Sequence, residues 1–164
     1  VSAPPCPPNT APKVTNIEDP KVDKVGPTKE IETLKKPVNY SISYNTTINN
    51  YRGTVIVTII DTLPHRIIAS ESNYACEDTA SYKCNAVYDN DKKITYTLTY
   101  ENVDTYKSGK ALEVKFNHKL SVKYDEADLI TKEQVIDYLM VVNMDRLATD
   151  NNELDSGMSL SMKK

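Results

Sequence analysis

One aspartate stands among aliphatic residues in a segment that otherwise reads as a buried strand, TVIVTIIDTLP at residues 54–64. Side chains alternate along a strand, so Asp61 shares a face with three aliphatic residues, Val55, Val57 and Ile59. An unpaired charge inside a protein costs several kcal/mol, so a buried carboxyl is usually protonated, paired with a cation or used in a reaction. The alternative is that Asp61 lies just past the end of the strand, in water, and opens the Leu-Pro turn that follows.

Three cysteines, Cys6, Cys76 and Cys84, offer a second kind of chemistry. Cys76 and Cys84 flank the polar stretch EDTASYK, a spacing that suits a small disulfide-closed loop in an oxidising compartment. The alternative is two free thiols, and the pairing of Cys6 stays open. A metal site is not expected, because only His65 and His118 could join the thiols and no CxxC or HxxxH spacing occurs. Both histidines are expected to be solvated.

Composition argues against several other classes of function. The formal charge is −3 over 164 residues, and acids and bases are interspersed, so there is no basic stripe for nucleic acid. Glycine occurs only 4 times, which makes glycine-rich phosphate loops improbable, and no GxSxG motif is found. No run approaches the roughly 18 apolar residues of a membrane helix. We therefore expect no turnover enzyme, and the sequence implies no cofactor.

The start of the chain differs in composition from the rest. Residues 1–20 hold six of the nine prolines and few apolar residues, which predicts an extended proline-rich linker. The chain begins at Val1 without a signal peptide, so it is expected to be a processed fragment. Residues 21–164 are long enough for one folded domain with its own core.

Alternation of apolar and polar residues predicts strands along most of this domain. The expected strands cover residues 22–25, 38–47, 54–61, 66–74, 92–100, 111–124 and 157–164. One short helix is expected at 131–139, where Thr131 and Gln134 form a capping box, and 138–147 is expected to resume as a strand. About seven to nine strands with one short helix predict an all-β antiparallel sandwich.

Two motifs in the predicted strands are similar to those of a known family: YSISY at 40–44 and VIVTIIDTLP at 55–64. With the order of the strands, they resemble the Ig-like repeat domains of Gram-positive surface proteins and pilins, including the collagen-adhesin (CnaA-like) type. The resemblance covers roughly residues 21–164 and implies an Ig-like sandwich. The cysteine pair after DTLP and the helical segment before the last strands depart from the family pattern.

The resemblance also implies a covalent cross-link. In many members a lysine on the first strand attacks an asparagine on a late strand, ammonia leaves, and a neighbouring acid assists. Burial favours this reaction because it keeps the lysine neutral and the acid protonated. Matched to this sequence, the resemblance assigns the amine to Lys24, the amide to Asn143 and the assisting acid to Asp61.

Other residues remain open for two of these roles. Lys24 could face solvent, and Asn143 could be an ordinary buried asparagine. The alternatives are Lys21 or Lys29 for the amine and Asn117 or Asn102 for the amide. A sandwich without any cross-link is also compatible with the sequence.

The function that the resemblance implies is structural. The chain would be a stalk or shaft domain of a bacterial cell-surface adhesin or pilin, extracellular and cell wall-associated, whose partners are neighbouring domains of the same protein. The alternative is an adhesive binding module that recognises a host protein or glycan through its loops or a sheet face. For that role, the 11 tyrosines and the loop between Cys76 and Cys84 would provide contacts. Neither role involves nucleic acid or a membrane segment.

Overall fold

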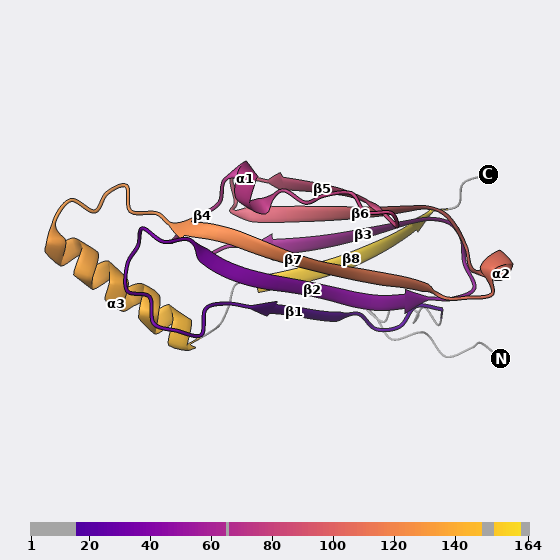
Figure 1. Ribbon diagram of the computed structural model, residues 1–164, viewed down its shortest axis with the longest axis horizontal. Coiled ribbons are helices and arrows are strands. Elements are labelled where there is room, and N and C mark those ends of the chain that lie inside the picture. Colours follow the sequence, from indigo (N-terminus) through magenta and orange to yellow (C-terminus); the bar gives the residue numbers. More distant parts are fainter. Residues whose placement is uncertain (1–15, 65, 149–152, 162–164) are drawn as a thin grey trace, which may run out of the picture.

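Two four-stranded antiparallel sheets pack face to face, as seen in the computed structural model, which describes residues 16–64, 66–148 and 153–161 (Figure 1). In spatial order, one sheet contains β1 (Lys21–Val25), β2 (Val38–Ile48), β7 (Leu112–Tyr124) and β4 (Ile67–Ile68). The other contains β5 (Lys83–Tyr88), β6 (Lys93–Asp104), β3 (Arg52–Thr62) and β8 (Glu153–Ser161). The expectation of an antiparallel β-sandwich is confirmed.

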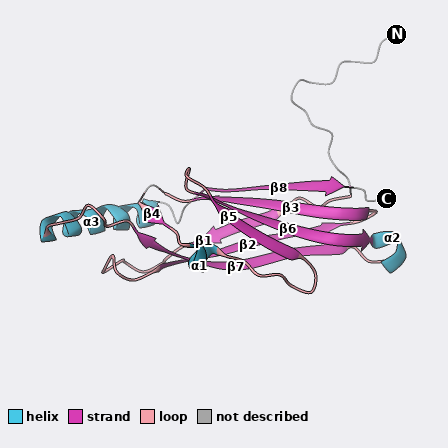
Figure 2. Ribbon diagram, turned by 90° about the horizontal axis from the view of Figure 1, so that it is seen from above, coloured by secondary structure: helices cyan, strands magenta, loops and turns pink. Residues whose placement is uncertain are grey.

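Three helices lie outside the two sheets. They are α1 (Glu71–Tyr74), α2 (Thr105–Ser108) and α3 (Lys132–Ala148). Figure 2 shows the sheets as two layers, with α3 extending from one end and α2 at the other. In the described part of the chain, no helix is both long and apolar enough to cross a membrane.

The core lies between the sheets and follows from the alternation in the long strands. In β2 and β3, buried and more exposed residues alternate along most of the strand. The largest side chains with almost no exposure include Tyr44 and Tyr96, so tyrosine takes the place of the absent tryptophan. Burying one large aliphatic side chain contributes about 1.5–3 kcal/mol, and the many aliphatic residues of these strands make this core the main source of stability.

The chain enters and leaves the sandwich at the same end. Ile17, just before β1, bridges to Ile48 at the end of β2. Ser161, at the end of β8, pairs with Thr54 near the start of β3. Helix α2 lies at this end and α3 at the opposite one (Figure 1). Residues 16–20, which the sequence assigned to the linker, therefore contact the sandwich. The rest of the predicted linker, residues 1–15, lies outside the described residues.

Helix α3 corrects the prediction of a strand at 138–147. The predicted capping box is present: the Thr131 hydroxyl accepts from the backbone N–H of Gln134 at 3.1 Å, and the Gln134 carboxamide accepts from the N–H of Thr131 at 2.8 Å. The helix then continues for 17 residues instead of two turns. Four residues at helical spacing pack on the end of the sandwich, Val135, Tyr138, Leu139 and Val142, and their contact outweighs the β propensity of the segment.

One further predicted element needs correction, and one observed strand was absent from the prediction. In the segment 66–74 only Ile67 and Ile68 pair, with the end of β7, before the chain turns into α1. Strand β5 was not expected. It pairs along its whole length with β6 and carries Cys84. The other predicted strands are confirmed where the structure describes them, with ends that differ by a few residues; residues 162–164 of the last predicted strand lie outside the described residues.

Candidate functional site

A lysine and an aspartate meet in the interior between the two sheets. The Lys24 ammonium nitrogen donates a hydrogen bond to Oδ1 of Asp61. The side chain of Lys24 is 3% exposed and that of Asp61 is 0% exposed. Asp61 lies within β3 and not in the turn that follows. Because β1 and β3 belong to different sheets, the pair connects the two layers.

Strand alternation places both groups inside. Asp61 follows Val55, Val57 and Ile59 on the inner face of β3, and all four side chains are fully buried. Lys24 pairs in register with Ile42 of β2, which also points into the core. The amine reaches Asp61 from the edge strand of the opposite sheet.

Aromatic rings and unpaired polar atoms surround the pair. The Lys24 nitrogen lies 4.6 Å from the centre of the Tyr40 ring, within cation–π range. Oδ2 of Asp61 and the hydroxyl of Tyr96 are both buried, and neither has a hydrogen-bond partner among the described residues. The charge of Asp61 also acts on Tyr96, whose pKa is raised mainly by burial and further by this carboxylate.

Burial shifts both members of the pair toward their uncharged forms. It lowers the pKa of Lys24 from 10.5 to about 8, although the charge of Asp61 and its hydrogen bond act in the opposite direction. Burial also raises the pKa of Asp61, against the opposing effect of Lys24. A neutral amine is a nucleophile, and a protonated carboxyl is a hydrogen-bond donor and proton shuttle. The geometry thus provides either a buried ion pair or the amine and acid of an acyl-transfer reaction.

The structure does not bring Asn143 to this pair. The predicted strand at Asn143 is wrong, because the residue lies on α3. Its Oδ1 accepts from the backbone N–H of Ile31 at 2.7 Å, and its Nδ2 donates to the Ile31 carbonyl at 2.8 Å. The amide is therefore engaged on both sides, and it fixes the segment between β1 and β2 against α3.

The alternative residues for the cross-link lie on the surface. Four side chains belong to this group and all are exposed: Lys21, Lys29, Asn102 and Asn117. Within the described residues, Lys24 hydrogen-bonds to Asp61 alone and no asparagine bonds to either member of the pair. Of the lysines considered, Lys24 is the one with a buried side chain.

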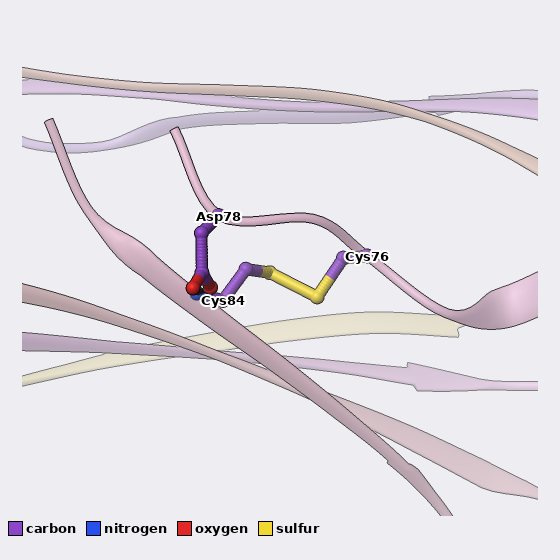
Figure 3. The surroundings of a disulfide bond; sticks show 3 residues. All are labelled: Cys76, Asp78 and Cys84. Atoms are coloured by element: carbon purple, nitrogen blue, oxygen red, sulfur yellow. Dashed lines mark hydrogen bonds between the residues drawn. A yellow bond between two sulfur atoms is a disulfide. The ribbon is translucent and has the colours of Figure 1, made fainter. Parts of the chain in front are cut away.

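Cys76 and Cys84 form a disulfide, as the spacing predicts (Figure 3). Their Cα atoms are 5.8 Å apart. Within the loop, Oδ1 of Asp78 accepts a hydrogen bond from the backbone N–H of Cys84 at 2.8 Å. A disulfide indicates an oxidising, extracytoplasmic environment. Cys6 and His65 lie outside the described residues.

His118 is half-buried against aromatic rings and is not fully solvated, which corrects the expectation above. Its ring stacks on Phe116 at 5.6 Å and lies 4.9 Å from the ring of Tyr96. Burial lowers the pKa of His118, against a hydrogen bond to the Tyr74 backbone. The alternation of Phe116, His118 and Leu120 was the sequence signal for this placement. In the described ranges no group of three His, Cys, Asp or Glu residues could hold a metal ion.

A scan against protein-family models, a search of curated proteins and a search of solved structures each returned no match to this chain.

Proposed function

We propose that this chain is a structural stalk domain of a bacterial cell-surface adhesin or pilin, with an Ig-like sandwich held together internally at Lys24. The observation that carries the proposal is the buried contact between Lys24 and Asp61, which joins the first strand of one sheet to a central strand of the other. The YSISY and VIVTIIDTLP motifs support the same assignment through their resemblance to this family. The disulfide supports it as well, because disulfides persist in the oxidising environment outside the cell. The domain would be extracellular and cell wall-associated, with neighbouring domains of the same protein as partners.

The proposal includes one self-made amide bond. The neutral amine of Lys24 attacks the carboxamide carbon of an asparagine, while protonated Asp61 donates a hydrogen bond to the carboxamide oxygen. The C–N bond to the asparagine nitrogen breaks, and that nitrogen leaves as ammonia with the proton lost by the lysine. Oδ2 of Asp61, which has no hydrogen-bond partner among the described residues, supports this role. Asn143 is held by Ile31, so the proposal leaves the identity of the asparagine to experiment.

Intact mass under denaturing, reducing conditions tests this bond. We expect wild type to be lighter than its sequence by one ammonia and the Asp61→Ala variant to have the full mass. The control is Asp23→Ala, which removes an exposed carboxylate of β1 and should leave the mass loss intact. Fragmentation of the linked peptide would locate the second residue. If wild type and Asp61→Ala both have the mass of their sequences, the covalent bond is refuted and the pair acts as an ion pair.

A stalk role also predicts resistance to pulling. In single-molecule pulling between the ends of the chain, Lys24→Met should unfold at a lower force than wild type, because the link between β1 and β3 is lost. The control is Lys21→Met on the same strand, where the side chain is exposed. Equal unfolding forces for both variants and wild type would argue against a brace at Lys24.

A second candidate function, a binding module for a host protein or glycan, is favoured by the path of the chain. Both described ends of the sandwich lie at the end that carries α2, opposite α3 (Figure 1). The tyrosines in and just before the cysteine loop do not support binding there: Tyr74 packs on Tyr88 at 5.7 Å, and Tyr82 packs on Tyr100 at 5.3 Å. Recognition would therefore use the α3 end, and binding assays with that end altered distinguish this role from a stalk.

A further inference from the structure

Helix α3 lies at the end of the molecule far from the entry and exit of the chain (Figure 1). It presents an apolar stripe to solvent. The stripe consists of Ile136, Met140 and Met144, which follow one another at intervals of four residues and so lie on one side of the helix. Their exposed fractions are 47%, 63% and 65%. Contiguous exposed apolar groups on a monomer often mark interaction sites.

The stripe is not needed to attach α3 to the sandwich. A different side of the helix does so, with Val142 buried and the Tyr138 hydroxyl donating to the Arg66 carbonyl at 2.9 Å. Asn143 contributes the two bonds to Ile31 described above. Methionine side chains are flexible and polarizable and adapt to varied apolar partners, so two of them on the free side suit docking.

Acidic residues accompany the stripe. Between residues 125 and 140 five acids occur against one base, Lys132, and all five are exposed: Asp125, Glu126, Asp128, Glu133 and Asp137. Glu133 and Asp137 lie three residues before Ile136 and Met140, beside the stripe, and Lys132 lies in line with it, four residues before Ile136. A surface that is apolar in the middle and acidic at its flank is complementary to an apolar surface with basic flanks.

We propose that the stripe of Ile136, Met140 and Met144, with Glu133 and Asp137 beside it, docks an amphipathic helix of a partner protein whose apolar face is flanked by lysine or arginine. Two helices packed in this way bury their apolar ridges and pair the flanking charges. A second copy of this chain fits less well, because the flank of its own stripe carries the acids Glu133 and Asp137 and not the basic residues that would complement them. The inference refines the binding-module candidate and uses no property of Lys24 or Asp61, so either can fail without the other.

Two labelled peptides test the proposal. One is an amphipathic helix of about 18 residues with leucine on one face and lysine on its flanks, and the other has glutamate in place of each lysine. In fluorescence anisotropy we expect the lysine peptide to bind at least about tenfold more tightly than the glutamate peptide, and its affinity to fall with added salt. The double variant Glu133→Lys/Asp137→Lys should reverse the preference.

Variants in the stripe complete the test. Met140→Glu should weaken binding of the lysine peptide about tenfold or more, as expected for an anchor residue. The matched control is Val87→Glu, which alters a residue of β5 that is 52% exposed and should leave binding unchanged. Circular dichroism of each variant verifies that α3 is folded, and the charge-reversal variant tests the same surface without touching the stripe.

Several results would overturn the proposal. Equal affinity for the two peptides, absence of binding, or equal effects of Met140→Glu and Val87→Glu would each do so. A dimer seen in sedimentation equilibrium and abolished by Met140→Glu would assign the stripe to a second copy. Binding to phosphatidylcholine vesicles that depends on Met140 would assign it to lipid.

Discussion

Replacing Asp61 by leucine should leave the amine of Lys24 inside the protein without its partner. Leucine keeps the branch at Cγ and removes the charge. Both effects that raise the pKa of Lys24, the charge of Asp61 and its hydrogen bond, are then lost, so this pKa falls below about 8. Keeping the amine uncharged at pH 7, against the ordinary value of 10.5, costs up to about 5 kcal/mol, since each tenfold change in protonation corresponds to about 1.4 kcal/mol.

Adding Lys24→Met to Asp61→Leu removes this cost. At pH 7 the second substitution should therefore raise the free energy of unfolding by about 3–5 kcal/mol. The control is Lys21→Met in the same background, which removes an exposed amine of β1 and should change stability by no more than about 0.5 kcal/mol. Both comparisons are made within Asp61→Leu, so neither depends on a covalent bond in wild type.

The pH dependence has a defined sign. In Asp61→Leu the folded protein binds fewer protons than the unfolded chain between the lowered pKa of Lys24 and 10.5, so stability rises with pH across this window. The double variant Asp61→Leu/Lys24→Met lacks this rise in stability with pH. The stability difference between the double variant and Asp61→Leu should therefore shrink toward zero as the pH approaches 10.5. Urea unfolding followed by circular dichroism at pH 7 and pH 10, with the disulfide intact, measures it. The reasoning is refuted if Lys24→Met stabilises no more than Lys21→Met, or if its benefit is the same at both pH values.

Three further predictions follow from burial and cross-linking. Leu98→Ala, in the core, should cost about 2–5 kcal/mol in urea unfolding, whereas Ile136→Ala on the exposed side of α3 should cost about 0.5 kcal/mol or less; similar losses would contradict the burial. Replacing Cys76 and Cys84 by serine should lower the free energy of unfolding by about 2.5 kcal/mol, the entropic contribution of closing a loop of this length. Equal stability of the oxidised wild type and the serine variant would contradict this prediction. Because burial lowers the pKa of His118, the stability it contributes is present above its ordinary pKa of 6.5 and lost as the pH falls. Between pH 7.5 and pH 5, His118→Phe should therefore lose less stability than wild type, and parallel losses would contradict the prediction.

The sequence predicted the buried faces of the strands better than the contacts between them. Alternation was sufficient to place Asp61 beside Val55, Val57 and Ile59, since period 2 fixes which residues share a face. The same pattern placed Lys24 on one face of its strand, but no local pattern says that β1 lies across from β3. That contact depends on how the two sheets are stacked, and only the family resemblance connected the two residues before the structure did.

The errors at Asn143 and in β5 have local causes. The run YLMVV contains residues with β propensity and was interpreted as a strand, although Val135, Tyr138, Leu139 and Val142 already had helical spacing. Packing of these residues against the end of the sandwich stabilises the helix over a strand in this segment. Strand β5 was missed because it is short and begins inside the polar cysteine loop, so turn-like composition concealed it.

The disulfide has a consequence for the outer edge of its sheet. β5 is the outermost strand on one side, and such a strand can accept another chain through its unpaired backbone groups. The N–H of Cys84 is bonded to the side chain of Asp78, and the disulfide to Cys76 keeps that segment alongside β5 (Figure 3). Reduction would free the segment and open this N–H to a strand from a neighbouring molecule. We therefore expect the oxidised protein to resist edge-to-edge pairing at this position better than the reduced protein.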